Sequence, residues 1–124
     1  MSENQNNKKY DLEDRTFEFA KRNRAFAKKL RKTIGNKEDV SQLIRSSGSV
    51  GANYIEANEA LSKKDFYHRA KICRKEAKES RYWLRLIDTN RDVGLEKERE
   101  ELIQEAQELM NIFGSIIRKS ESNR

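Results

Sequence analysis

The sequence contains no proline, five glycines and one cysteine among its 124 residues. An all-β fold needs turn residues about every 8–12 positions, and this chain does not supply them. The same scarcity excludes a collagenous or linker-rich chain. One cysteine excludes an internal disulfide framework and a Cys-rich zinc site. These absences favour a helical protein in a reduced, cytoplasmic setting.

Long apolar runs are also missing. No stretch of about 18 apolar residues occurs, so the sequence predicts no membrane-spanning segment. Residues 1–10, MSENQNNKKY, lack the apolar core of a signal peptide, and we expect them to form a disordered tail. The remaining length suits one domain, which we place over residues 11–120.

Charge is plentiful, since charged residues make up 39% of the chain and hydrophobic residues 35%. This balance predicts a thin, elongated helical core with a large solvated surface. The net charge of +6 alternates along the chain, at +5 for residues 1–34, −2 for 35–61, +5 for 62–90 and −2 for 91–124. Such alternation helps neighbouring helices to pair and leaves the basic segments facing solvent.

Apolar residues recur at spacings of three and four in four segments, which predicts helices over residues 11–34, 38–58, 63–89 and 95–119. Gly35 and Asn36 are predicted to stop the first helix. The third segment has the clearest seam, formed by Phe66, Ala70, Cys73, Ala77, Ser80, Leu84 and Ile87. Four long helices with short connections predict an all-α, antiparallel up-down-up-down four-helix bundle.

Small residues dominate the middle of the second predicted helix, where the sequence reads RSSGSVGAN. Each glycine inside a helix costs about 1 kcal/mol relative to alanine. Close approach of a neighbouring backbone would offset that cost, and a loop at this position is the alternative.

A basic stripe follows the third predicted helix on a face rotated away from its seam, and it is about 30 Å long at ~1.5 Å per residue. Tyr67 and Tyr82 lie near it as candidates for stacking on bases. We therefore expect nucleic-acid phosphates to bind this stripe and a set of cations on the first helix, although a solvated face would have the same composition. The candidate residues are Lys71, Arg74, Lys78, Arg81 and Arg85, with Lys21, Lys28 and Arg31 alongside.

A third face of the same helix combines apolar side chains with two carboxylates. It either forms a subunit interface or widens the core. We predict a network in which Arg45 pairs with Glu76 or Glu79 and Asn53 hydrogen-bonds to either carboxylate. The full set of predicted interface residues is Arg45, Asn53, Glu56, Glu76, Glu79 and Trp83.

Catalytic and metal-binding patterns are weak. Neither Glu76 nor Glu79 has a histidine three residues further on, unlike the Glu-x-x-His pairs of di-iron bundles. His68 is expected to be a partly exposed helix residue, and Cys73 a small buried apolar one. We therefore expect no catalytic residue, metal, cofactor, small-molecule substrate or membrane partner.

Two segments carry a family resemblance. Residues 42–57, QLIRSSGSVGANYIEA, resemble the QL-RS-x-x-S-x-x-AN-x-x-E segment of the bacterial 23S rRNA intervening-sequence proteins. Asp65-Phe66 and residues 75–86, KEAKESRYWLRL, resemble that family's DF…KEA-x-E-(S/T)-x-YWL-x-L segment, and residues 17–20, FEFA, add to the match. The chain departs from the family pattern at Ala57, where glycine is usual.

The resemblance implies a left-handed up-down-up-down bundle and a homopentameric ring. It also implies a more distant similarity to basic pentameric accessory proteins of diversity-generating retroelements, which work with a reverse transcriptase and nucleic acid. Our leading hypothesis is a non-enzymatic RNA- or nucleic-acid-binding homo-oligomer. The alternative is a structural or adaptor module whose basic stripe docks an acidic protein partner.

Overall fold

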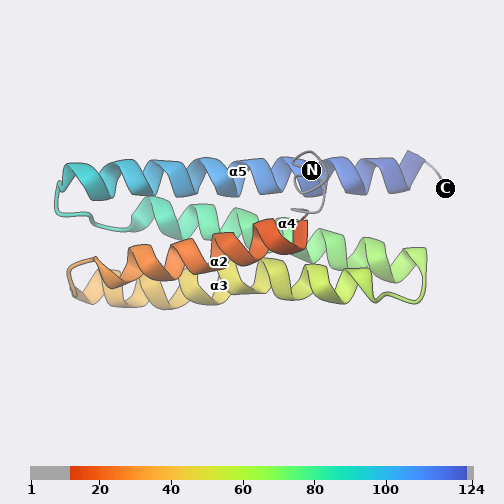
Figure 1. Ribbon diagram of the computed structural model, residues 1–124, viewed down its shortest axis with the longest axis horizontal. Coiled ribbons are helices and arrows are strands. Elements are labelled where there is room, and N and C mark those ends of the chain that lie inside the picture. The colour runs from red at the N-terminus through yellow and green to blue at the C-terminus, as the bar shows by residue number, and fades with distance from the viewer. Residues whose placement is uncertain (1–11, 123–124) are drawn as a thin grey trace, which may run out of the picture.

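The computed structural model describes residues 12–122, which form four helices and no strand. The helices are α2 (Leu12–Lys28), α3 (Ile34–Asn58), α4 (Lys63–Leu86) and α5 (Val93–Ser122). Successive helices run in opposite directions and are joined by short loops at alternating ends of the molecule (Figure 1). The predicted up-down-up-down bundle is confirmed. The predicted tail over residues 1–10 lies outside the described residues.

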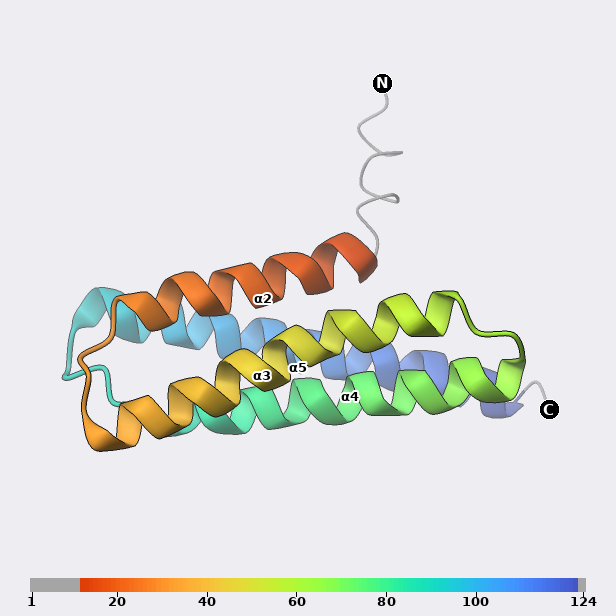
Figure 2. The same ribbon diagram turned by 90° about the horizontal axis from the view of Figure 1, so that it is seen from below.

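The helices are arranged so that α2 packs on α3 and α5, and α4 also packs on α3 and α5. As a result α2 and α4 lie on diagonal corners of the bundle, as seen in Figure 2. With 17 residues α2 is the shortest helix, against 30 residues in α5. The other three helices therefore continue past the start of α2.

The first connection differs from the prediction. The first helix ends at Lys28 rather than near residue 34, and Gly35 and Asn36 lie in the first turn of α3. The reason is a helix cap, because the Thr33 side chain accepts a hydrogen bond from the Asn36 amide at 3.0 Å. Leu30 follows the end of α2 and is buried although it lies in the loop.

The other boundaries lie closer to expectation. The side chain of Ser62 caps α4 by accepting from the Asp65 amide at 3.1 Å. Ile87 leaves helical geometry with a ψ of 136°, so α4 ends at Leu86, three residues before the predicted end. The fourth helix begins two residues earlier than predicted, where Asp92 accepts from the Leu95 amide at 2.9 Å.

The run of small residues is helical throughout, so the loop alternative is wrong. A Cβ added to Gly51 would lie 3.0 Å from Thr16 Oγ1 and 3.6 Å from the Thr16 backbone carbonyl carbon. On the other side of α3, the hydroxyls of Ser46 and Ser80 are 2.8 Å apart. The predicted close approach is present, against α2 at Gly51 and against α4 at Ser46.

The predicted seams form the core, which is divided into two apolar clusters. One contains Phe19, Val50 and Phe113, and the other contains Phe26 and Leu43. Between these clusters along the seams lie four buried polar residues, which are Asn23, Ser46, Ser47 and Ser80. A polar layer of this kind restricts the register in which the helices can pack. Within the described residues, no helix is long and apolar enough to cross a membrane.

Candidate nucleic-acid interface

The predicted cations of α4 form one continuous surface beside α5, which we call the α4 stripe. Lys71, Arg74, Lys78 and Arg85 are exposed, and Arg81 is half-buried. Seven-residue spacing keeps Tyr67, Arg74 and Arg81 on the side of α4 that contacts α5. The stripe therefore borders the contact between α4 and α5, and its cations are carried by one uninterrupted helix.

Tyr67 is not available for stacking on bases, so this part of the prediction is wrong. The side chain is 8% exposed, and its hydroxyl donates to the Ile117 carbonyl at 2.6 Å. The Lys71 ammonium lies 5.2 Å from the centre of the tyrosine ring. Tyr67 instead joins α4 to α5, whereas Tyr82 keeps 54% of its surface exposed next to the stripe.

The part of α5 opposite the centre of the stripe is mostly uncharged. There Gln107 accepts a hydrogen bond from Arg81 Nη1 and donates to Asn111 at 3.1 Å. Gly114 follows one turn later and lies against Arg74. Carboxylates come close at one end, where Glu100 and Arg85 line the same shallow hollow.

Several α5 carboxylates face α2 instead. Arg15 donates to Glu105 at 2.7 Å and to Glu108 at 2.6 Å, while Lys29 pairs with Glu98 at 2.7 Å. The hydrogen bond to Glu105 is the main cause of the raised pKa of Arg15, and the bonds from Gln104 and then Arg15 lower the pKa of Glu108. These acids are committed to the α2–α5 contact and leave the α4 stripe largely uncompensated.

Of the three cations predicted on the first helix, two lie on α2 and do not extend the α4 stripe. Lys21 and Lys28 are exposed on α2, and Lys21 lies 5.5 Å from the centre of the Phe17 ring. Arg31 belongs to the following loop, with Nη2 3.8 Å from Asp88. Because α2 and α4 occupy diagonal corners, Lys21 and Lys28 form a surface separate from the α4 stripe.

The predicted interface residues gather along the outer face of α3 and α4, which we call the α3–α4 face. Asn53 accepts a hydrogen bond from Arg69 Nη1 at 3.0 Å, so its partner is neither Glu76 nor Glu79, contrary to the prediction. Arg45 donates to Gln42 at 2.6 Å, and its positive charge lowers the pKa of Glu76, against the larger effect of burial. The sequence analysis did not predict that Arg69 bonds to Asn53, although helical spacing places Arg69 on the same face of α4 as Glu76.

Glu76 is the unusual member of this face. Its Oε1 atom is buried and has no hydrogen-bond partner among the described residues. Burial raises the pKa of this carboxyl, and the charge of Glu79 raises it further, while Lys75 and Arg45 oppose the change. A buried carboxylate oxygen without a donor is costly, so this position favours the approach of a donor from outside the chain.

Trp83 has two surroundings. It is half-buried and packs partly against the apolar cluster of Phe26 and Leu43, which supports the idea that this face widens the core. Its ring also meets Tyr82 edge-on at 5.0 Å, and the next turn exposes 49% of Leu86. Glu56 is exposed on α3, and Glu79 is half-buried on α4.

Two side chains considered for chemistry have structural surroundings. Cys73 is fully buried, its thiol donates to the Val50 carbonyl at 3.4 Å, and burial raises its pKa to about 12. A thiol with that pKa is a poor nucleophile. His68 is exposed on α4. Among residues 12–122, no three His, Cys, Asp or Glu side chains are grouped to hold a metal ion.

A hollow lies at the end of the bundle formed by the α3–α4 loop. Its volume is about 990 Å³, and it is lined by residues that include Ala57, Leu61, Lys63 and Phe66. The sequence suggested no such space. Tyr67, which was predicted to stack on bases, lines this hollow, whereas none of the predicted phosphate-binding or interface residues does.

The fold and these two surfaces define an antiparallel four-helix bundle protein with a basic stripe along one helix. The pattern of the 23S rRNA-intervening sequence protein family matches residues 8–115, and the chain belongs to this family. A crystal structure of a protein of unknown function from the S23 ribosomal protein family of Bacteroides thetaiotaomicron is similar, with 30% identity and a TM-score of 0.71. The match covers 86% of this chain and 98% of that one. None of the curated proteins matches.

Proposed function

We propose that this chain is a non-enzymatic protein that binds RNA or other nucleic acid through the α4 stripe. The observation that carries the proposal is the exposure of Lys71, Arg74 and Lys78 along one helix, opposite a part of α5 that presents amides and a glycine. Binding of this kind gains free energy by releasing counterions from phosphates, and it needs closely spaced cations more than base contacts.

The α3–α4 face supports a second part of the proposal, which is assembly of several copies into a homo-oligomer, expected to be a pentamer. A donor from a second copy would satisfy the buried Glu76 oxygen. Burial of the exposed Leu86 surface would add hydrophobic stabilisation in the same contact. Repetition of the α4 stripe around an oligomer would multiply the number of phosphate contacts.

Charge reversal tests the nucleic-acid proposal. The variant Lys71→Glu, Lys78→Glu, Arg85→Glu should lose RNA binding in a fluorescence anisotropy titration while the oligomer remains intact. The matched control is Lys32→Glu, Lys37→Glu, Lys97→Glu, which makes the same change in net charge at exposed positions outside the stripe. An equal loss of RNA affinity in both variants would show that net charge alone explains the effect, and it would refute the role of the stripe.

The same variants separate the alternative function, in which the stripe docks an acidic protein. That function predicts no RNA binding by the unaltered chain at low salt, together with a stripe-dependent complex with an acidic protein. Loss of the oligomer on charge reversal would show instead that the stripe is a subunit contact.

Assembly is tested by sedimentation velocity. Leu86→Glu places a charge on the α3–α4 face and should dissociate the oligomer. Phe17→Glu alters a side chain that is 60% exposed on α2 and should leave the oligomer unchanged. A single-chain mass for the unaltered protein at all concentrations would refute the assembly proposal.

A further inference from the structure

Three side chains of α4 at seven-residue spacing meet α5, and the middle one differs from its neighbours. Tyr67 donates to the Ile117 carbonyl, and Arg81 donates to the Gln107 side chain. Between them, Arg74 meets Gly114, which offers no side-chain acceptor. The α4–α5 contact is thus fixed by the hydrogen bonds of Tyr67 and Arg81. Between these bonds, Arg74 lies over a residue without a side chain.

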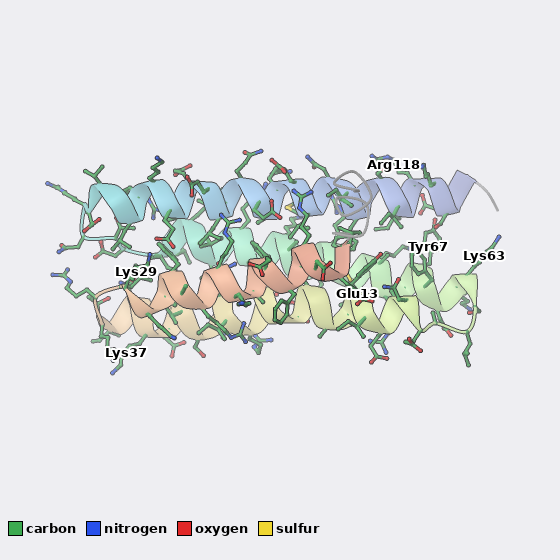
Figure 3. All side chains as sticks on the ribbon, in the orientation of Figure 1. Glu13, Lys29, Lys37, Lys63, Tyr67 and Arg118 are labelled. Carbon is green, nitrogen blue, oxygen red and sulfur yellow. The ribbon has the colours of Figure 1, made fainter. Side chains whose placement is uncertain are left out.

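A second arginine reaches the same place from α5. A Cβ added to Gly114 would lie 3.5 Å from Arg74 Nε and 3.5 Å from Arg118 Nη1, so the two nitrogens are separated by at most twice that distance. Both arginines are exposed, whereas Gly114 beneath them is buried. Figure 3 shows Arg118 at the same end of the molecule as Tyr67.

Two guanidinium groups in one place repel each other, and an anion between them would relieve that repulsion. Among residues 12–122 the ion pairs involve other cations, namely Arg15, Lys29, Arg31 and Arg99, and neither Arg74 nor Arg118 pairs with a carboxylate. A phosphate whose oxygens lie about 2.8 Å from each nitrogen could bridge this separation.

We propose that Arg74 and Arg118 form a seat for a single phosphate group over Gly114. Arg118 is the new residue, because sequence spacing along α4 alone could not bring it to the stripe. The inference rests on the proposed function in that the phosphate is a backbone phosphodiester held over Gly114, where α4 and α5 meet. A free phosphorylated molecule shares the same chemistry, and the experiment below separates the two sources.

A double-mutant cycle tests the seat. Arg74→Gln and Arg118→Gln should each weaken binding of a short duplex RNA by roughly tenfold or more, as expected for hydrogen bonds to a charged group. Each should also reduce by about one the slope with which the logarithm of the binding constant falls with the logarithm of the salt concentration, which we call the salt slope. Because the arginines share one phosphate, the double variant should lower the slope by about one and not by about two. Arg118→Lys should recover only part of the affinity, since lysine lacks the planar fork.

The control is Arg24→Gln, which removes one exposed arginine from the diagonal helix α2 and should change the affinity within about twofold. If RNA binds but Arg118→Gln behaves like this control, or if the double variant shows additive slopes, the seat is refuted and the proposed function stands. If RNA does not bind, the proposed function fails, and inorganic pyrophosphate then tests the seat by thermal shift. A pyrophosphate shift that disappears in Arg118→Gln supports a small-molecule seat, and the absence of any shift refutes it.

Discussion

Asn36 and Asp88 exchange two hydrogen bonds across the end of the bundle. Asn36 Nδ2 donates to the Asp88 carbonyl at 2.9 Å, and the Asp88 amide donates to Asn36 Oδ1 at 2.9 Å. Asn36 also donates to the Arg31 carbonyl at 2.9 Å, so one buried side chain joins the loop after α2 to the loop after α4. These two loops fix how the α2–α3 pair meets the α4–α5 pair.

Replacement of Asn36 should therefore destabilise the whole fold. Asn36→Ala leaves three backbone groups without their partner, and we expect the free energy of unfolding to fall by about 2–3 kcal/mol. Urea denaturation would measure this change, provided that the dependence of the unfolding free energy on urea concentration is the same in both proteins. Asn58→Ala, which removes a single exposed bond to Glu13, should cost less than about 1 kcal/mol. Similar values for the two variants would contradict the role of Asn36.

Gly48 and Gly51, in the middle of α3, should respond to alanine with changes in stability of opposite sign. At Gly51 the new methyl group would press on Thr16, whose Oγ1 is held by the Leu12 carbonyl at 2.6 Å, so Gly51→Ala should destabilise by about 1–2 kcal/mol. At Gly48 the nearest group is the flexible end of Arg24 at 3.4 Å, so Gly48→Ala should stabilise by about 0.5–1 kcal/mol through helix propensity. Thermal unfolding of both variants tests this, and a gain at Gly51 would refute the close approach of α2 and α3.

In the α4–α5 loop, replacement of one residue by glycine should stabilise the fold. Asn90 and Arg91 have φ values of 56° and 61°, in the left-handed region that costs most residues about 1 kcal/mol. Arg91→Gly should therefore raise the free energy of unfolding by about 0.5–1 kcal/mol, offset in part by the greater freedom of glycine in the unfolded chain. Arg91→Ala keeps the strained geometry and should bring no gain. A loss of stability in Arg91→Gly alone would contradict the prediction.

Glu76 should make stability depend on pH. Its pKa is raised in the folded chain, so the folded state binds the proton more tightly than the unfolded state, whose pKa is about 4.3. Its contribution is present at low pH and is lost as pH rises through the folded pKa. Glu76→Gln should raise the unfolding free energy of the single chain near pH 7 and change it little near pH 4. An equal change at both pH values would show that the charge of Glu76 is not responsible.

Much of the fold could be predicted because helical spacing reports which residues are buried. The seam that contains Cys73 and Leu84 is confirmed, since both residues are fully buried. Spacing does not report caps, so the end of α2 was placed too late, where Thr33 in fact begins α3. Spacing along one helix also says nothing about neighbours, which is why Arg69 as the partner of Asn53 and Arg118 beside Arg74 required the three-dimensional structure.

The central claim, that the α4 stripe binds nucleic acid, is tested most directly by fluorescence anisotropy with labelled structured RNA and duplex DNA. The titrations should be made at about 50 and about 200 mM salt. Six or more phosphate contacts predict that affinity falls roughly a thousandfold or more across this range. Tight, salt-sensitive binding that favours RNA is the result the account predicts. No binding of either nucleic acid at the lower salt concentration would contradict it.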